Sequence, residues 1–306
     1  MNLTALTSSI FSPCLCLLSG RWRTGLRARA SAGACASALA LAGWMPAQAQ
    51  PQPALPDDAP RWLAQLPTTP LLLLGEQHDN PSHQALQRAT VQTLAGQGRL
   101  AALVLEMADQ GGSTRGLPAQ ASEAEVRAAL RWGDEAQGGW PWAVYGPVVM
   151  AAVAAGVPVL GGNLPRAEMR AVMADERWDQ RLPAAALAEQ QAQMQQGHCG
   201  LLPERQIRPM ARIQIARDQR LSEVAASALQ PGQTVLLVAG NGHVRRDLGV
   251  PLHLPSGQDH HVLMLLPTQT GAEQALTADA QAHTVWPTPP GPDTDHCAEL
   301  REQMKR

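Results

Sequence analysis

The stretch "LLVAGNGHVRRDLGVP" (residues 236–251) is an apolar run that stops at a glycine and continues directly into Asn241, Gly242 and His243. The stretch "LLLLGEQH" (residues 71–78) has the same pattern: an apolar run, a glycine, two further residues and a histidine. Each apolar run has the length of a buried strand. The two matching turns therefore predict two strands that end in polar side chains.

Further apolar runs of strand length alternate along the chain with helical patterns. Three more strand candidates are the runs at residues 100–107, 157–163 and 261–267. Helical patterns, two of which begin with a proline as helices often do, occupy residues 81–95, 122–132, 146–156 and 209–226. Strands separated by helices predict an α/β fold with a mainly parallel sheet and helices on both faces.

The first 49 residues have the features of a secretory signal peptide. Four arginines between residues 21 and 29 precede an uncharged run, which ends near the small-residue site Ala47-Gln48-Ala49. No cysteine directly follows the run, as a lipid anchor requires. We therefore expect a periplasmic or secreted protein, at most loosely associated with the outer membrane. The alternative is an amphipathic N-terminal helix that is retained.

Composition and charge narrow the function classes further. An apolar content of 45% is enough to bury a core. The chain has 24 basic and 26 acidic side chains, and removal of the signal peptide, with its four arginines and no acids, leaves 20 basic ones. This acidic balance argues against nucleic acid as a partner.

Cysteine usage agrees with export. Three of the five cysteines lie in the first 49 residues, which leaves Cys199 and Cys297. An even pair in an oxidising compartment predicts a disulfide, which would pin the Pro-rich C-terminal tail to the domain. The alternative is a pair of metal half-sites, because each cysteine has a histidine directly before it.

Polar residues follow the strand candidates at their carboxyl ends, where ligands bind in parallel α/β sheets. They are Glu76, His78, Glu106, Asn163, Asn241 and His243. Glu76, His78, Glu106 and His243 together suit a divalent metal that activates water for hydrolysis. The alternative is that the histidines only cap or pack at the strand ends. The sequence contains no nucleophile elbow, P-loop or dinucleotide fingerprint.

Six motifs in unbroken order between residues 68 and 266 resemble one known family. They are "LLLLGEQHDNPSHQ", "LVLEM", "GWPWAVYGPVVMAAVAAGVPVLGGNLPR", "GHCGLLPE", "QIARDQRLSEVAA" and "VAGNGHVRRDLGVPLHL". Together they resemble the ChaN-like haem-binding uptake family, which is similar to the Tiki and TraB metal-dependent hydrolases and the erythromycin-esterase group. The resemblance implies a periplasmic or outer-membrane-associated α/β protein that binds haem for iron uptake. Members of the family are often lipoproteins, and this chain departs from them by lacking a lipobox.

With this resemblance, four segments are expected along the chain. They are a signal peptide at 1–49, a Pro-rich leader at 50–67, a ChaN-like domain at 68–267 and a Pro-rich tail at 268–306.

Tyr145 is the candidate ligand of the haem iron. It lies in the matching motif "GWPWAVYGP" and is the only tyrosine of the chain. A phenolate is a hard anionic ligand that suits ferric haem. The alternative is a tyrosine packed against neighbouring tryptophans with its hydroxyl capping a helix. Candidate groups for the haem propionates or the pocket rim are His78, His243, Arg166 and Arg245.

Two hypotheses of different classes follow. The first is a haem-binding protein with no chemistry of its own, whose partners are haem, a second copy in a homodimer, and haem-transport components of the outer membrane or periplasm. The second is an enzyme, a metal-dependent hydrolase that uses Glu76, His78, Glu106 and His243 with a divalent ion.

Overall fold

The structure is a computed structural model that describes residues 55–133, 139–268 and 280–304, so the expected signal peptide lies outside the described residues. Its centre is a six-stranded sheet with the order β3-β2-β4-β1-β5-β6, in which all neighbouring strands run parallel. The strands are β1 (Leu71–Glu76), β2 (Leu100–Asp109), β3 (Val159–Asn163), β4 (Thr234–Gly240), β5 (His261–Pro267) and β6 (Thr284–Thr288). The predicted parallel α/β fold is confirmed.

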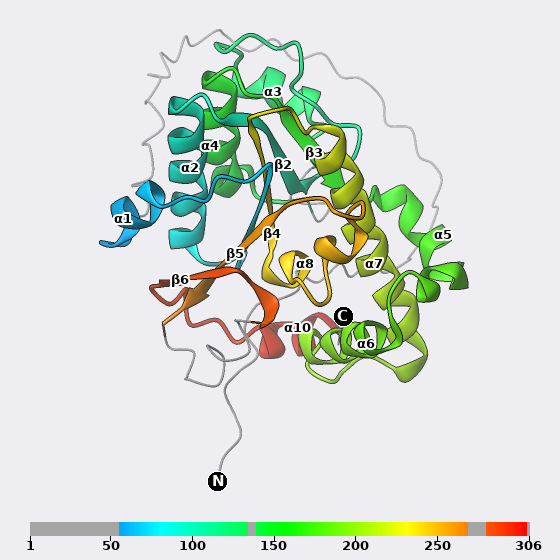
Figure 1. The fold of residues 1–306 in the computed structure, drawn as a ribbon. Helices are drawn as coiled ribbons and strands as arrows, with labels where there is room; N and C mark the ends of the chain where they lie inside the picture. Colours follow the sequence, from blue (N-terminus) through cyan, green and yellow to red (C-terminus); the bar gives the residue numbers. More distant parts are fainter. Residues whose placement is uncertain (1–54, 134–138, 269–279, 305–306) are drawn as a thin grey trace, which may run out of the picture. The chain divides into compact units, whose positions relative to one another are not determined.

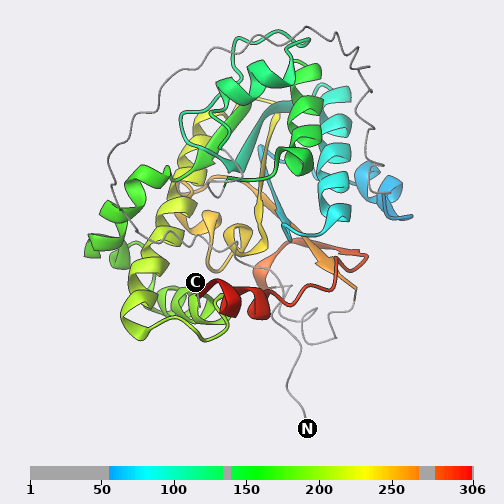
Figure 2. The ribbon, with the colours of Figure 1, turned by 180° about the vertical axis from the view of Figure 1, so that it is seen from behind.

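Helices cover both faces of the sheet (Figures 1 and 2). One face packs against α1 (Ala59–Ala64), α2 (Pro81–Gly96), α3 (Glu123–Ala129) and α4 (Trp142–Ala154). The opposite face packs against α7 (Glu204–Ser227) and α8 (Asn241–Val244). The remaining helices are α5 (Met169–Ala174), α6 (Ala184–Gly197), α10 (His296–Met304) and the 3₁₀ helices η2 (Arg166–Glu168), η3 (Glu176–Gln180) and η4 (Val250–His253).

Alternation along the strands explains the two layers. In β1, Leu72 and Leu74 belong to the core under α2 and α4, whereas Leu71 and Leu73 belong to the core under α7. Successive side chains of a strand point to opposite faces, and a strand that is apolar at every position is buried on both. All six residues of β1 are buried accordingly.

The strand order places the two glycine-histidine turns side by side. Strand β4 lies between β1 and β2, and Glu76 at the end of β1 is in register with Gly240 at the end of β4. Glu106 lies in β2, the other neighbour of β4. The three strands that carry the predicted site residues are therefore adjacent.

Three elements differ from those predicted. Helix α7 begins at Glu204 and contains Pro209, and α4 begins at Trp142 and contains Pro147, so neither proline marks the helix start. In α4 the reason is burial, because Trp142 and Tyr145 ahead of the proline both pack into the core. Strand β6 lies in the range expected to form only a Pro-rich tail.

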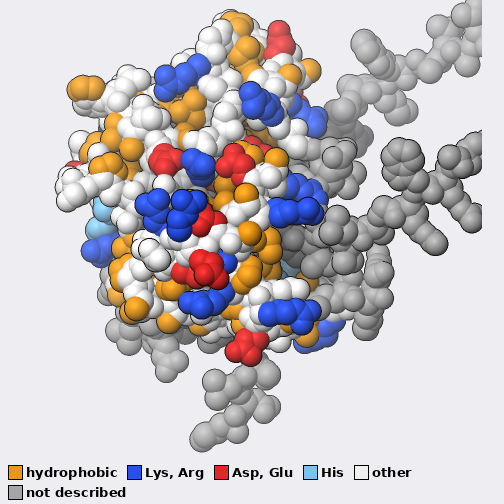
Figure 3. Space-filling view, turned by 90° about the vertical axis from the view of Figure 1, so that its right-hand side faces the viewer, with side chains coloured by type: hydrophobic (Ala, Val, Ile, Leu, Met, Phe, Trp, Pro, Cys, Tyr) orange, Lys and Arg blue, Asp and Glu red, His pale blue; other side chains and the backbone are white. Residues whose placement is uncertain are grey.

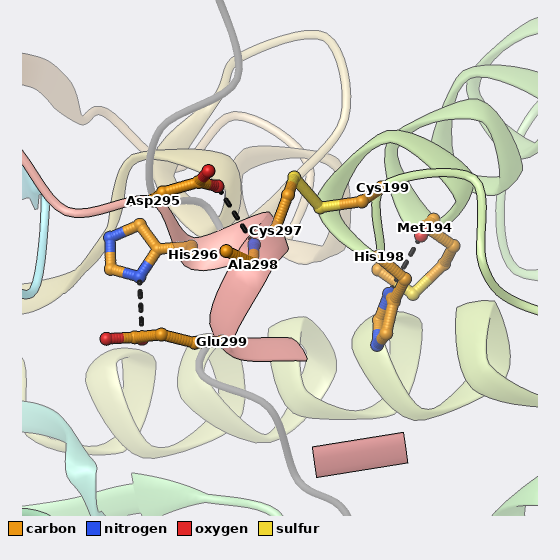
Figure 4. The surroundings of a disulfide bond; sticks show 8 residues. All are labelled: Met194, His198, Cys199, Asp295, His296, Cys297, Ala298 and Glu299. Atoms are coloured by element: carbon orange, nitrogen blue, oxygen red, sulfur yellow. Dashed lines mark hydrogen bonds and ion pairs between the residues drawn. A yellow bond between two sulfur atoms is a disulfide. The ribbon is translucent and has the colours of Figure 1, made fainter. Parts of the chain in front are cut away.

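The predicted disulfide is confirmed. Cys199, directly after α6, is bonded to Cys297 at the start of α10, with the two Cα atoms 5.7 Å apart (Figure 4). Within the described part of the chain, none of the helices combines the length and the hydropathy needed to cross a bilayer.

Charges of both signs are interspersed on the face that carries α5 and α7 (Figure 3). Arg220 of α7 pairs with Glu168 of η2 at 3.2 Å, with side chains 31% and 46% exposed.

Candidate ligand site at the strand ends

Glu76 is the hub of the site. Its carboxylate is fully buried at the end of β1. Oxygen Oε1 accepts hydrogen bonds of 2.8 Å from both Tyr145 Oη and His78 Nδ1. Oxygen Oε2 accepts from Gln84 Nε2 at 2.6 Å and from Gln87 Nε2 at 2.5 Å, both on α2. Four donors from three parts of the chain compensate for the cost of burying this carboxylate.

Tyr145 is a buried member of this cluster, and only 1% of its surface is exposed. Its oxygen is also 3.2 Å from His78 Nδ1. Trp140 meets its ring edge to face at 5.8 Å between centroids, and Trp132 is tilted against it at 6.5 Å. Burial, and next the nearby charge of Glu76, hold the pKa of Tyr145 well above its usual range. In the described conformation the side chain is therefore a neutral phenol.

A second chain of polar groups starts at Glu106 in β2. Its Oε2 accepts the Gly240 backbone N–H at 2.8 Å, and its Oε1 lies 3.4 Å from His243 Nε2. The other ring nitrogen of His243, Nδ1, donates to Asp218 Oδ1 of α7 at 2.5 Å. His78 Nε2, at 3.7 Å from Glu106, connects this chain to the Glu76 hub. The histidines of the two turns thus meet at one shared carboxylate, that of Glu106.

The carboxylates raise the pKa of both imidazoles. Burial alone would lower the pKa of His243, but Glu106 and Asp218 raise it to about 10. Burial also opposes the charge on His78, and Glu106 and Glu76 outweigh it, so the pKa of His78 is raised as well. In return, His243 and His78 hold the pKa of Glu106 far below its usual range despite burial.

The geometry does not favour the metal-hydrolase interpretation. His78 and His243 each face carboxylate oxygens at both ring nitrogens. Among the described residues, no group of three or more His, Cys, Asp or Glu side chains is arranged to hold a metal ion. The disulfide also removes Cys199 and Cys297 as metal ligands.

The glycines of the two turns allow the close packing of the site. A Cβ atom on Gly240 would lie 2.8 Å from His78 Nε2, so only glycine lets this histidine approach β4. A Cβ atom on Gly75 would overlap Asn241 and Val244 of α8. In both turns the apolar run ends in glycine because side chains of the other turn pack against that position.

The other predicted residues lie around this centre. Arg245 is buried, but its guanidinium pairs with Asp247 at 2.7 Å and with Glu189 at 3.1 Å, so its charge is already compensated. Arg166 is exposed at the start of η2. The amide nitrogen of Asn241 donates to the Leu265 carbonyl at 2.9 Å, which ties α8 to β5.

Several residues of the site were not predicted. Asp218 holds His243, Gln84 and Gln87 hold Glu76, and Trp140 packs on His78 with 4.5 Å between ring centroids. A signal for Asp218 exists in the sequence. It stands between Ile215 and Leu221 at a spacing of three, on the buried face of α7. A lone acid on such a face indicates a buried partner.

A small cavity of about 10 Å³ borders His243 and Asp218, and three glutamines contribute to its lining. Gln190, Gln193 and Gln214 line it with Leu248. This is room for about one water molecule. The Oε1 atom of Gln214 is buried without a hydrogen-bond partner. The cavity is far smaller than a pocket for a large cofactor.

Among solved structures, ChaN of Campylobacter jejuni, described as binding haem cofacially, has 22% identity and a TM-score of 0.56, over 69% of this chain and 87% of that one. This likeness shows the fold. The type III effector HopBA1 (12% identity, TM-score 0.33, 66% and 78% covered) and a Bacillus cereus protein (12%, 0.28, 70% and 76%) are more distant.

No curated protein is similar enough to count as a relative. The family model described as "Haem-binding uptake, Tiki superfamily, ChaN" matches residues 62–254 and includes every polar residue of the site. The resemblance inferred from the six motifs is therefore confirmed, and the chain belongs to the ChaN family of haem-binding uptake proteins in the Tiki superfamily.

Proposed function

We propose that the protein is an exported haem-binding protein that acts in haem uptake or haem handling, with Tyr145 as the iron ligand. The observation that carries the proposal is the contact between Tyr145 Oη and Glu76 Oε1 at 2.8 Å inside the region matched by the family. Export rests on the signal-peptide features of residues 1–49.

The residues around Tyr145 fit a ferric haem. Ferric iron takes a phenolate as a hard anionic ligand, so Tyr145 must lose its proton. Glu76 Oε1 already accepts the hydrogen bond from the phenol and is the group placed to take this proton. Trp132 and Trp140 supply flat apolar walls beside the phenol ring. His78, 3.2 Å from the phenol oxygen, can donate a hydrogen bond to the phenolate.

Binding at Tyr145 requires the cluster to open. The phenol is 1% exposed, and the groups directly around its oxygen are Glu76 and His78. A haem is far too large for the cavity of about 10 Å³ beside His243. The proposal includes a homodimer, in which a second copy of the chain covers the other face of the haem. It also includes haem-transport components of the outer membrane or periplasm as binding partners.

Titration with haemin tests the proposal. Wild type should give a high-spin ferric spectrum typical of tyrosine ligation, and Tyr145→Phe should change that spectrum sharply. His253→Ala is the matched control, because His253 is a partly buried ring whose Nε2 makes no hydrogen bond. The spectrum should change little in this variant. An unchanged spectrum in Tyr145→Phe would assign the iron to another ligand.

Elemental analysis of the same samples distinguishes the alternative. If folded wild type binds no haemin but purifies with a stoichiometric divalent ion, the hydrolase hypothesis with Glu76, His78, Glu106 and His243 replaces the haem proposal. Loss of that ion in His243→Ala would then identify the site.

A further inference from the structure

The C-terminal segment of residues 289–297, here called the strap, lies outside the region matched by the family, residues 62–254. It connects β6 to α10 and is the red segment between these labels in Figure 1. Its near end is fixed by β6, which is paired with β5 along five residues. Trp286 of β6 stacks on Trp62 with 5.4 Å between centroids.

The strap is bound to the turn of residues 77–80, here called the His78 turn. The amide nitrogen of Asn80 donates to the carbonyl of Pro289 at 2.9 Å. His296 Nε2 lies 2.8 Å from Asp79 Oδ2 near the other end of the strap. Consecutive residues of the turn therefore hold two points of the strap that are seven residues apart.

The buried His83 connects the same turn to β6. The backbone N–H of Gln77 donates to His83 Nδ1 at 2.8 Å, so the proton of this imidazole is on Nε2. Nε2 then donates to Thr288 Oγ1 at 2.8 Å, at the last residue of β6. Burial lowers the pKa of His83 to about 3, which agrees with a neutral ring. The His78 turn is thus connected to β6 as well as to the strap.

The far end of the strap is held by the disulfide. Cys297 is bonded to Cys199, and Figure 4 shows His296 beside this bond. Both cysteines are partly exposed. The contact described between this end and the His78 turn is the pair of His296 and Asp79, whose side chains are 36% and 30% exposed. Ion pairs with this exposure contribute little to stability.

The His78 turn covers the proposed iron ligand. His78 Nδ1 lies 3.2 Å from Tyr145 Oη, and its ring packs on Trp140. With the turn in this position, Tyr145 is 1% exposed. We propose that the Cys199–Cys297 disulfide is a redox latch, which through the strap keeps the His78 turn closed over Tyr145 and on reduction lets haem reach it. The latch rests on the proposed function, because it controls access to the same site.

The opening reaction is thiol–disulfide exchange with a dithiol reductant. A thiolate of the dithiol attacks one sulfur, forms a mixed disulfide and releases the other cysteine as a thiolate, which takes up a proton. The second thiol of the dithiol then displaces the remaining cysteine and forms a disulfide within the reductant. Two electrons and two protons pass to Cys199 and Cys297, and the strap keeps only its non-covalent contacts.

Hydrogen exchange of the full chain without haem tests the latch on its own. The Gln77 amide is the reporter, because its hydrogen bond to His83 breaks when the turn opens. Exchange at residues 77–80 should be about tenfold faster after reduction and removal of the dithiol, the change expected for losing roughly one hydrogen bond. Cys199→Ser/Cys297→Ser should match the reduced protein. Equal exchange in oxidised and reduced protein would overturn the latch.

Haemin association followed by stopped-flow absorbance tests the consequence. Reduced protein and the double serine variant should bind several-fold faster than oxidised wild type. His296→Ala keeps the disulfide and removes only the part-exposed Asp79 contact, so it should bind at the rate of oxidised wild type, and fast binding in this variant would assign control to the ion pair and overturn the latch. Arg301→Ala, an exposed position on the same helix, is its matched control.

The two proposals fail in different ways. Equal association rates in oxidised and reduced protein would overturn the latch and leave haem binding intact. Faster exchange on reduction without haemin binding in any form would reject the haem function itself.

Discussion

Gly240 and His78 belong to different strand-end turns, yet they are in direct contact. A Cβ atom on Gly240 would lie 2.8 Å from His78 Nε2. The same glycine donates its backbone N–H to Glu106 at 2.8 Å, the carboxylate that both histidines approach. The shape of β4 at its last residue therefore decides where the histidine of the β1 turn can lie.

Gly240→Ala should displace His78 without unfolding the protein. The backbone at Gly240 has φ −57°, which alanine adopts readily, so the methyl group acts on the histidine rather than on the strand. Haemin affinity should fall about tenfold, roughly the effect of one lost hydrogen bond. Gly96→Ala is the control, because nothing lies within 4 Å of its Cβ position. Equal affinities in the two variants would contradict the role of Gly240.

Asp218→Asn should flatten the pH dependence of stability. The pKa of His243 is raised to about 10 in the folded protein from 6.5, so its contribution is complete below about pH 6.5 and is lost as the pH rises towards 10. The free energy of unfolding should fall over this range by at most about 1.4 kcal/mol per pH unit. The asparagine variant should show a smaller slope, measured by urea denaturation at several pH values.

Asp247→Asn is the matched control for that experiment. Its carboxylate pairs with Arg245 and does not touch His243, so the slope should be that of wild type. The assignment to His243 fails if both variants change the slope equally.

Glu76→Ala should be among the most destabilising substitutions at the site. It leaves Tyr145, His78 and two glutamines without their common acceptor. We expect a loss of about 3 kcal/mol or more, as for breaking other buried charged networks. Gln87→Ala removes one donor and should cost about 1 kcal/mol. Equal losses in chemical denaturation would show that Glu76 is not the hub.

Tyr145→Phe should leave the fold nearly unchanged. The ring keeps its packing against Trp132 and Trp140, and Glu76 keeps three other donors. The cost should be about 1 kcal/mol or less. A thermal melt close to wild type would assign any loss of haemin binding to the missing oxygen. A large drop in Tm would instead make the hydroxyl a structural group.

Removing the disulfide should lower stability as well as free the strap. The bond joins residues 98 apart in the sequence. Closing a loop of this size stabilises by up to about 4.7 kcal/mol through the entropy of the unfolded chain. Thiol labelling of denatured, non-reduced protein should find no reactive thiol at Cys199 or Cys297. Labelling at both positions would show that the bond does not form.

The residues at the centre of the site could be predicted because the end of a buried strand is visible in a short stretch of sequence. Glu76, His78, Glu106 and His243 each follow or end an apolar run, and parallel strands bring their carboxyl ends to one edge. Tyr145 was predicted from its place in the motif "GWPWAVYGP" of the resemblance, where it is the only tyrosine of the chain. The structure places its oxygen on Glu76.

What the sequence could not predict depends on pairing between distant segments. One partner of Arg245, Asp247, is two residues away, but the other is Glu189 on α6, 56 residues away, which no local pattern indicates. Strand β6 was hidden by Pro287, which reads as part of a Pro-rich tail. A proline is tolerated there because β6 is the edge of the sheet.

The position of β4 between β1 and β2 also sets the order of folding. Neither β1 nor β2 can complete its pairing until residues 234–240 are available, because each has β4 as an inner neighbour. The two strands are separated from β4 by more than a hundred residues, and such distant pairings form slowly. In a chain that is synthesised from its N-terminus, the inner edges of β1 and β2 would stay exposed until β4 inserts between them. Such edges attract other chains, so the ligand site is assembled in the same late step that removes the main risk of aggregation.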